Sequence, residues 1–277
     1  MDLAMVREVK RLSNGDAQQG DWREGDAWLA GGTWLFSEPQ LHLRRLIDLQ
    51  DLEWPALTIT DAGLEIAATC KIVALVHFAA PHDWLAAHLF REWANCFLMS
   101  FKIWNMATVG GNLCMSLPAG AMISLTAGLE GVCTIWPKEG GERKVSVVDF
   151  IHGPQQNELK PGDLLRSITL PTSALRKRAA FRQVSLTHIG RSTMLLIATR
   201  CPDTDEFLLT ITASTSRPVP VRFASMPSAN DLQDALRAAI PDGMYFADVH
   251  GTPEYRKQMT LRFAEELRAE FLTRGNP

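Results

Sequence analysis

Short apolar runs and stretches of helical periodicity alternate along the chain, separated by turns that contain glycine or proline. Apolar residues near helical spacing predict a helix over Leu3–Leu12, another over Asp83–Met99, and a closing helix from Pro253 to about Leu272. One apolar stripe marks the buried face of the closing helix: Leu261, Ala264, Leu267 and Phe271.

Runs rich in apolar and β-branched residues predict strands between these helices. Leu57–Thr60 and Leu64–Ile66 flank Asp61-Ala62-Gly63 and predict a hairpin. A boundary is expected near Pro171 to Arg178, and the sequence shows no internal repeat. The other predicted strands are Trp28–Ala30, Leu46–Leu49, Val132–Trp136, Lys144–Val148, Asp163–Leu170, Ala180–Val184 and Phe207–Thr212.

The segment Ala30-Gly31-Gly32-Thr33-Trp34-Leu35 directly follows a predicted strand. Glycines adopt positive φ at little cost and leave the peptide N–H groups unshielded, so successive amides can close around an anion such as a pyrophosphate. That geometry suits a dinucleotide, although Gly-Gly after a strand also occurs as a plain tight turn.

A second glycine pair lies in Ala107-Thr108-Val109-Gly110-Gly111-Asn112-Leu113. The Thr108 hydroxyl and Asn112 carboxamide can bond phosphate or ribityl oxygens, and the glycines allow close backbone approach. We therefore expect both loops to present N–H groups to a dinucleotide. Neither loop continues with Lys-Ser or Lys-Thr, and neither fits Gly-x-Gly-x-x-Gly, so a Walker loop is excluded and a nicotinamide-binding Rossmann fold loses support.

Composition and charge narrow the classes of partner. A chain of 277 residues exceeds the usual single domain, so we expect two or three packed units. The net charge of −3, with both signs interspersed, argues against a nucleic-acid or anionic-membrane surface. No apolar run could span a bilayer, and the N-terminal segment lacks the apolar core of a signal peptide, so we expect a cytoplasmic protein.

The residues that could hold a metal or act in hydrolysis form no recognisable constellation. His77, His82 and His88 fall at no tight ligand spacing with carboxylates, so no metal site is expected. No nucleophile, base and orienting acid emerge as a triad, so we name no catalytic residue. The five cysteines are widely spaced and are expected to be buried small hydrophobes: Cys70, Cys96, Cys114, Cys133 and Cys201.

The two glycine loops resemble those of the FAD-binding subunits of molybdenum hydroxylases of the xanthine dehydrogenase and carbon monoxide dehydrogenase type. The first is similar to that family's Ala-Gly-Gly-Thr loop, and the second to its Ala-Thr-Ile-Gly-Gly-Asn loop. Further similar segments follow in the family's order and cover nearly the whole chain: Leu46–Leu49, Lys102–Asn105, Asp163–Pro171, Ala180–Gln183, Arg217–Arg222 and Tyr255-Arg256.

This resemblance implies an α+β fold. It places a two-part FAD-binding domain of the vanillyl-alcohol-oxidase-like type at residues 1–172, with subdomains of about 1–55 and 56–172, and a smaller α+β C-terminal flavoprotein domain at 173–277. It also implies that both loops wrap the FAD pyrophosphate, that Leu165 packs against the flavin ring, and that Arg182 stands for a flavin-proximal lysine. The implied cofactor-binding residues are Leu29, Ala30, Gly31, Gly32, Thr33, Trp34, Leu35, Thr108, Gly110, Gly111, Asn112, Leu165 and Arg182.

The resemblance further implies an oxidoreductase subunit that passes electrons from iron-sulfur clusters to NAD⁺, oxygen or a quinone. Partners would then be an iron-sulfur subunit and a molybdopterin subunit of one heteromeric hydroxylase. The chain departs from the pattern at Ala121, where family members usually carry an aspartate beside the ribityl chain, and at Trp104 and Leu186. An alternative therefore stays open: a non-catalytic assembly subunit of the same fold with a degenerate FAD site.

Overall fold

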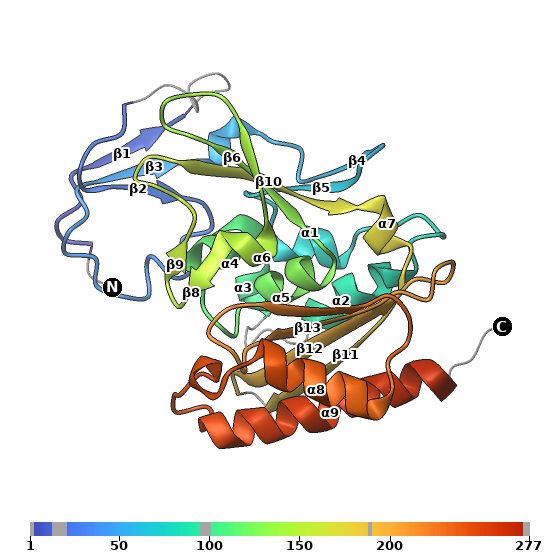
Figure 1. Ribbon diagram of the computed structural model, residues 1–277. Helices are drawn as coiled ribbons and strands as arrows, with labels where there is room; N and C mark the ends of the chain where they lie inside the picture. The colour runs from blue at the N-terminus through green and yellow to red at the C-terminus, as the bar shows by residue number, and fades with distance from the viewer. Residues whose placement is uncertain (1–2, 13–20, 95–100, 188–189, 274–277) are drawn as a thin grey trace.

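The computed structural model describes residues 3–12, 21–94, 101–187 and 190–273 (Figure 1). Three parallel strands form an N-terminal sheet in the order β1-β3-β2: β1 Glu8–Arg11, β2 Asp26–Leu29 and β3 Arg45–Asp48. The predictions of strands at β2 and β3 are confirmed. The helix predicted over Leu3–Leu12 is wrong, because pairing with the central strand β3 overrides the weak local periodicity of this segment.

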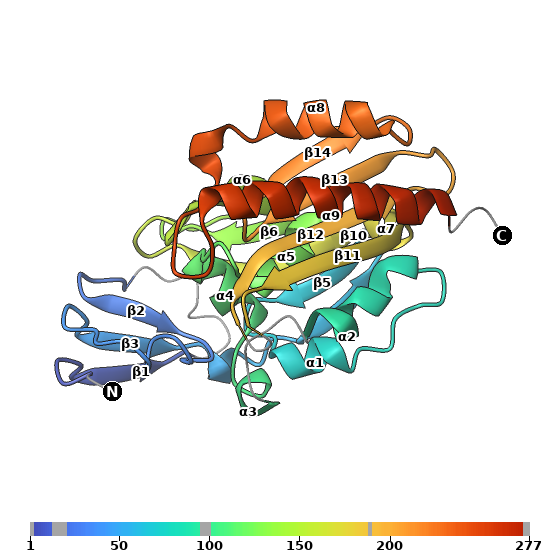
Figure 2. The same ribbon diagram turned by 90° about the horizontal axis from the view of Figure 1, so that it is seen from below.

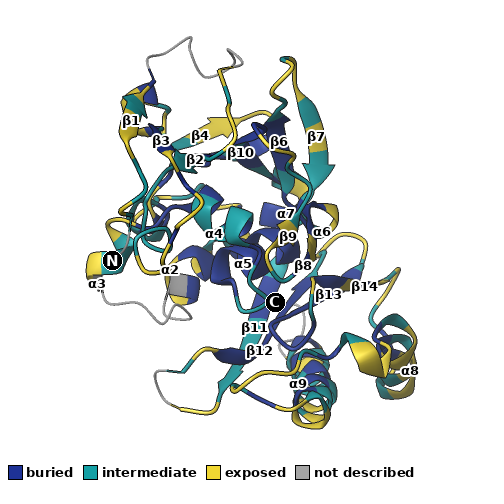
Figure 3. Ribbon diagram, turned by 90° about the vertical axis from the view of Figure 1, so that its left-hand side faces the viewer, coloured by how far each residue is buried: buried dark blue, intermediate teal, exposed yellow. Residues whose placement is uncertain are grey.

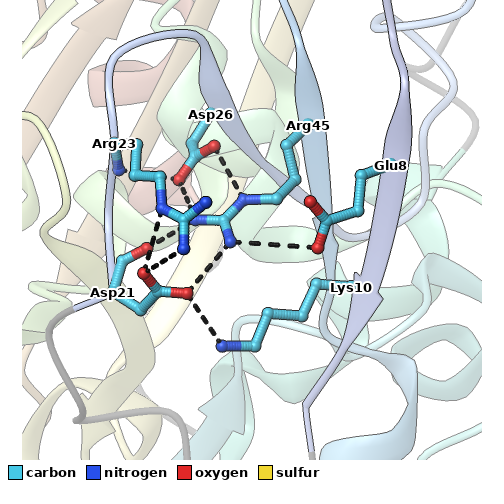
Figure 4. Close-up of polar contacts among 6 residues, drawn as sticks. All are labelled: Glu8, Lys10, Asp21, Arg23, Asp26 and Arg45. Atoms are coloured by element: carbon cyan, nitrogen blue, oxygen red, sulfur yellow. Dashed lines mark hydrogen bonds and ion pairs between the residues drawn. The ribbon is translucent and has the colours of Figure 1, made fainter.

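A buried ion-pair cluster ties the three strands of this sheet together (Figure 4). Arg45 on β3 donates to both oxygens of Asp26 on β2, with Nε–Oδ1 at 2.9 Å and Nη2–Oδ2 at 2.6 Å. Its Nη1 lies 3.0 Å from Asp21 Oδ2, and Lys10 on β1 reaches the same oxygen at 3.3 Å. The cluster fixes the direction in which β2 enters the first glycine loop.

The second sheet has five antiparallel strands in the order β4-β5-β10-β6-β7. The predicted hairpin is confirmed as β4 and β5, and the strands predicted at Val132–Trp136 and Asp163–Leu170 are confirmed as β6 and β10. The bounds are β4 Leu57–Thr60, β5 Gly63–Ala67, β6 Val132–Trp136, β7 Arg143–Ser146 and β10 Leu164–Pro171, with a separate two-stranded ribbon of β8 Ile151–Gly153 and β9 Gln156–Asn157.

Short helices cover one face of this sheet. Of the helix predicted over Asp83–Met99, His88–Ala94 is helical and residues 95–99 lie outside the described residues. The helical elements are η1 Gln50–Leu52, α1 Ile72–Val76, η2 Leu85–Ala87, α2 His88–Ala94, α3 Phe101–Trp104, α4 Val109–Met115, α5 Ala121–Gly128, α6 Val147–Phe150 and α7 Thr172–Leu175.

The C-terminal part is a four-stranded antiparallel meander covered by two helices (Figure 2). The strands predicted at Ala180–Val184 and Phe207–Thr212 and the closing helix are confirmed as β11, β13 and α9. β12, β14 and α8 were not predicted. The bounds are β11 Arg178–Ser185, β12 Ser192–Arg200, β13 Phe207–Thr212, β14 Val219–Phe223, α8 Ala229–Ala239, η3 Asp242–Met244 and α9 Pro253–Thr273. Among the described helices, none offers an apolar stretch long enough to cross a bilayer.

Helix α5 lies between the two large sheets, in the core that both of them help to form (Figure 3). All eight of its residues are buried, and they carry no polar face. A Cβ on Gly128 would come within 2.8 Å of the Ile197 side chain on β12, so the helix packs closely on the C-terminal sheet. The Ser124 hydroxyl hydrogen-bonds to that of Thr212 on β13.

Four charged side chains join the two halves of the molecule at a second place. Lys177, just before β11, donates to Glu130 at 2.6 Å and to Glu206 at 2.8 Å. Arg222 on β14 contacts the same two carboxylates at 2.6 and 2.5 Å. Lys177 is nearly buried, so this alternating network is shielded better than an ordinary surface ion pair.

Candidate functional site: the glycine loops and the cavity beside them

The first glycine loop leaves β2 at Leu29 and packs directly against the second. A Cβ on Gly31 would lie 2.1 Å from the carbonyl oxygen of Met106, so only glycine fits at this crossing. Gly32 has a φ of +67°, which glycine adopts without strain. Among the described residues, none accepts a hydrogen bond from the N–H of Gly31, Gly32 or Thr33. The first loop therefore has the free amides that the sequence predicted.

The second loop differs, and the expectation that it also presents free amides is wrong. Thr108 is the N-cap of α4, and its Oγ1 accepts from the N–H of Gly111 at 3.1 Å. The N–H groups of Val109 and Gly110 each donate at 2.9 Å to backbone carbonyls of the segment after β5, and that of Asn112 donates to the Thr108 carbonyl at 3.1 Å. Helix capping and tertiary pairing use these donors before any ligand can.

The two glycines of the second loop also have different surroundings. A Cβ on Gly110 would meet Ala68 at 2.4 Å, so this glycine permits α4 to approach the end of β5. A Cβ on Gly111 would meet only the Thr108 hydroxyl, at 2.8 Å. The Asn112 carboxamide accepts from the Met122 N–H at 2.9 Å and so links the loop to α5. This loop mainly positions α4 and α5.

A cavity of about 590 Å³, in the size range of small-molecule sites, opens beside both loops. Thr33 and Trp34 line it from the first loop, and Asn112 from the second. Ala121 lines it at the start of α5, so the side chain that replaces the expected aspartate is apolar and faces this space. Ala30, Gly31 and Thr108 border a second, much smaller cavity where the loops cross.

Three residues at or beside the large cavity have a left-handed backbone conformation. Gln155 and Ala213, which both line it, have φ of 57° and 63°, and Ser116, whose carbonyl accepts from the Gln155 N–H, has φ of 49°. Non-glycine residues in this region are strained by about 1 to 3 kcal/mol each and occur preferentially at functional sites. The clustering supports this cavity as the working site.

The C-terminal half supplies the other wall, which the sequence did not reveal. Ser192 on β12, Phe246 and Asp248 before α9, and Arg256 on α9 all line the cavity. Arg256 is 1% exposed and contacts Asp248 as an ion pair. Tyr255-Arg256 was recognised only as the opening of the last helix, and no local pattern marks an arginine there as part of a site.

Two expected cofactor contacts lie elsewhere. Arg182 on β11 pairs with Glu270 at 2.6 Å and Glu266 at 3.5 Å on α9, and it is not among the residues that line the large cavity. Successive side chains on a strand point to opposite faces, and here the neighbouring Phe181 takes the inner face, against Trp93. The Arg182 guanidinium therefore has carboxylate partners within this chain.

Leu165 is 2% exposed and packs in the core below the five-stranded sheet. It does not line the large cavity, and neither do Leu29 and Leu35. Gly32 does not line it either, and a Cβ there would meet the Phe36 ring. Of the thirteen expected contacts, Thr33, Trp34 and Asn112 reach the large cavity, while Ala30, Gly31 and Thr108 reach the small one.

The thiols of Cys70 and Cys114 are not poised as ligands. Burial raises the pKa of Cys70 and of Cys114 to about 12, which keeps both protonated near neutral pH. Over the described ranges, no group of three or more His, Cys, Asp or Glu side chains could hold a metal ion.

Residues 17–173, more than half of the chain, match the family described as the FAD binding domain in molybdopterin dehydrogenase. The α subunit of the 6-hydroxypseudooxynicotine dehydrogenase complex of Paenarthrobacter nicotinovorans is 24% identical over 186 residues, which are 64% of this chain and 62% of that protein. The β subunit of caffeine dehydrogenase of Pseudomonas sp. strain CBB1 is 31% identical over 87 residues, 31% of this chain and 30% of that protein. The chain thus spans less than two thirds of the length of these curated relatives.

Solved structures share the fold over nearly the full length. Quinoline 2-oxidoreductase from Pseudomonas putida 86 aligns with a TM-score of 0.78 at 18% identity, covering 98% of both chains. A Cu,Mo-containing carbon monoxide dehydrogenase aligns with a TM-score of 0.79 at 20% identity, covering 96% of this chain and 99% of that one. The match over residues 17–173 shows that the chain belongs to the family of FAD-binding domains of molybdopterin dehydrogenases, whose cofactor is FAD.

Proposed function

We propose that FAD binds non-covalently with its pyrophosphate against the first loop and its riboflavin half in the large cavity. The observation that carries this is the row of free N–H groups at Gly31, Gly32 and Thr33, next to a cavity of ligand size. The second loop supports the first through the Gly31 to Met106 crossing. It contributes the Asn112 side of the cavity, and its amides from Val109 to Asn112 are already paired within the protein.

When bound, FAD would supply redox chemistry, accepting and passing on electrons one or two at a time. The residues of this chain bind and orient it: Thr33 and Trp34 form one wall of the cavity, and Phe246 belongs to the opposite wall. The apolar Ala121 and the buried α5 below it exclude water from that side. We assign no catalytic side chain.

The chain is proposed to act as the flavin subunit of a heteromeric molybdenum hydroxylase. Relatives carry names of dehydrogenase complex subunits, which supports a chain that works with partners. The partners would be an iron-sulfur subunit that delivers electrons and a molybdopterin subunit that oxidises the substrate, with NAD⁺, oxygen or a quinone as acceptor in the cytoplasm. We also propose a division into residues 1–172, with a vanillyl-alcohol-oxidase-like arrangement, and 173–277.

The flavin content of the purified full-length chain tests this function. The expected protein is yellow, shows flavin absorption bands, and on denaturation releases FAD in about one equivalent. Co-purification of the natively expressed chain, with iron and molybdenum determination, tests the partners. A colourless chain that binds no added FAD would contradict the proposal.

The second candidate is a non-catalytic assembly subunit, and the observation that favours it is the apolar Ala121 on the cavity wall. Ala121→Asp restores a carboxylate there. If FAD is the ligand, the variant should bind it about tenfold more tightly, since a hydrogen bond to a charged group is worth roughly 1.5 to 3 kcal/mol at best. Equal or weaker binding by equilibrium titration would favour the assembly role or a remodelled ribityl path.

A further inference from the structure

The C-terminal wall of the large cavity is organised around one buried arginine. Arg256 donates from Nε to the Gly251 carbonyl at 3.2 Å and from Nη1 to the carbonyls of Thr193 and Ala213, at 2.5 and 2.6 Å. Nη2 donates to Asp248 Oδ1. These contacts fix the arginine on three different segments, so the carboxylate that it holds is fixed as well.

The two carboxylate oxygens of Asp248 differ in their hydrogen bonds within the protein. Oδ1 accepts from Arg256 and also from the N–H of His250 at 2.8 Å. Among the described residues, no donor reaches Oδ2. The side chain is 29% exposed and lines the cavity, so this oxygen is a pre-positioned acceptor.

The rest of the cavity indicates which ligand group would use that acceptor. Trp34 and Phe246 line it with aromatic rings, which suit a flat ring system. Asp248 is the one carboxylate among the described residues that line the space, and Ala121 offers no polar atom. A flat heteroaromatic group with an N–H donor, or a chain of hydroxyls attached to it, would be bound by this set, and the riboflavin half of FAD has both.

We propose that Asp248, held in place by the buried Arg256, accepts a hydrogen bond from the riboflavin half of FAD and anchors the flavin in this chain. The inference rests on the proposed function, because it requires FAD in the large cavity. It assigns the anchor to the C-terminal half, whereas the pyrophosphate is held by the first loop of the N-terminal half.

Asp248→Asn is the decisive variant. The asparagine Oδ1 can still accept from Arg256 and His250, so the buried guanidinium keeps its partner. Only the free oxygen changes, from an acceptor to an N–H₂ donor. Asp248→Glu is the second variant, which keeps the charge but displaces the oxygens by one methylene.

Apoprotein of the full-length chain is titrated with FAD, riboflavin and ADP, each followed by calorimetry and, for the flavins, by fluorescence. Asp248→Asn should weaken FAD and riboflavin about 10- to 100-fold, the range for one charge-assisted hydrogen bond, and leave ADP unchanged. Asp248→Glu should weaken riboflavin less. Unchanged ADP binding also shows that each variant is folded.

Asp234→Asn is the matched control, because Asp234 is a 77% exposed acid on α8 that pairs with Arg237. It should bind all three ligands as the wild type does. Wild-type riboflavin affinity in Asp248→Asn, or an equal loss of ADP binding, would overturn the proposal. Failure of the wild-type chain to bind FAD would instead contradict the proposed function itself, so the two failures are distinguishable.

Discussion

The two glycine loops carry the same dipeptide and are built in opposite ways. At Gly31-Gly32 the chain leaves a parallel strand, and the amides stay free. At Gly110-Gly111 it enters a helix, and every amide from Val109 to Asn112 has a partner within the protein. A glycine pair therefore indicates that the backbone comes close to another group. The neighbouring elements decide whether that group is a ligand or another part of the protein.

The contacts that hold the two loops in place differ as well. The strand that carries the first loop is held by the ion pair of Asp26 and Arg45, whose side chains are 2% and 5% exposed. The second loop is held by the Thr108 cap and by backbone pairing. Variants that remove one support at a time can therefore break or sharpen the comparison.

Asp26→Ala should have the largest effect. It leaves the Arg45 guanidinium buried without its main partner, which typically costs about 3 to 5 kcal/mol of stability. Urea denaturation measures the loss, and FAD affinity should fall with it because β2 sets the direction of the first loop. Asp21→Ala, at the half-exposed edge of the same cluster, should cost much less. Wild-type stability of Asp26→Ala would show that the cluster does not support the loop.

Gly31→Ala should have the next largest effect. The added Cβ meets a backbone carbonyl at the loop crossing, and overpacking of this kind costs roughly 1 to 3 kcal/mol. FAD and ADP should both bind about tenfold more weakly or worse, since the free amides are displaced. Gly243→Ala is the control, because a Cβ there has no neighbour within 4 Å. Equal thermal stability and ADP affinity of the two variants would contradict the crossing as described.

Thr108→Ala should cost about 1 kcal/mol through loss of the α4 cap. ADP affinity should stay near that of the wild type, because the amides of this loop from Val109 to Asn112 have partners within the protein. Thr108→Ser keeps a hydroxyl and should restore most of the stability. A large loss of ADP affinity in a stable Thr108→Ala protein would move the second loop into direct pyrophosphate binding.

The smallest effect is on the pH dependence of stability. Burial alone would raise the pKa of Asp26, but hydrogen bonds from Arg45 and from the Arg23 N–H hold that pKa below its usual range. Arg45, Arg23 and Lys10 lower the pKa of Asp21 as well. A lowered native pKa stabilises the fold above the unfolded value of about 4, and this stabilisation is lost as the pH falls below it. Asp26→Asn should show a flatter decline in urea midpoint between about pH 5 and pH 3; an unchanged slope would contradict this.

Much of the fold followed from local pattern. The hairpin of β4 and β5 and the closing helix are fixed by residues close together in the sequence, and both glycine pairs could be recognised from their own segments. β12 was not predicted because Ser192 to Thr199 is buried on both faces and shows no alternation. The N-terminal helix was wrong because β1 exists only through its pairing with β3.

The candidate site was only partly predictable. The first loop carries its own signal, but whether an amide is free depends on what packs against it. Arg182 was expected beside the flavin, and its side chain pairs with Glu266 and Glu270 on α9, a tertiary contact that no local pattern indicates. Asp248 and Arg256 meet the loops only through tertiary structure, so their part in the cavity could not be read from neighbouring residues.

The position of α5 between the two large sheets affects how the chain folds during its synthesis. During synthesis α5 leaves the ribosome well before β12 and β13, the strands that cover its second face. Until Thr212 has emerged, the nascent chain therefore carries an apolar helix with one side uncovered. Domains that fold during synthesis usually do so one after another from the N-terminus. The first half alone therefore cannot bury both sides of α5, and we expect a nascent or truncated chain to expose this apolar surface.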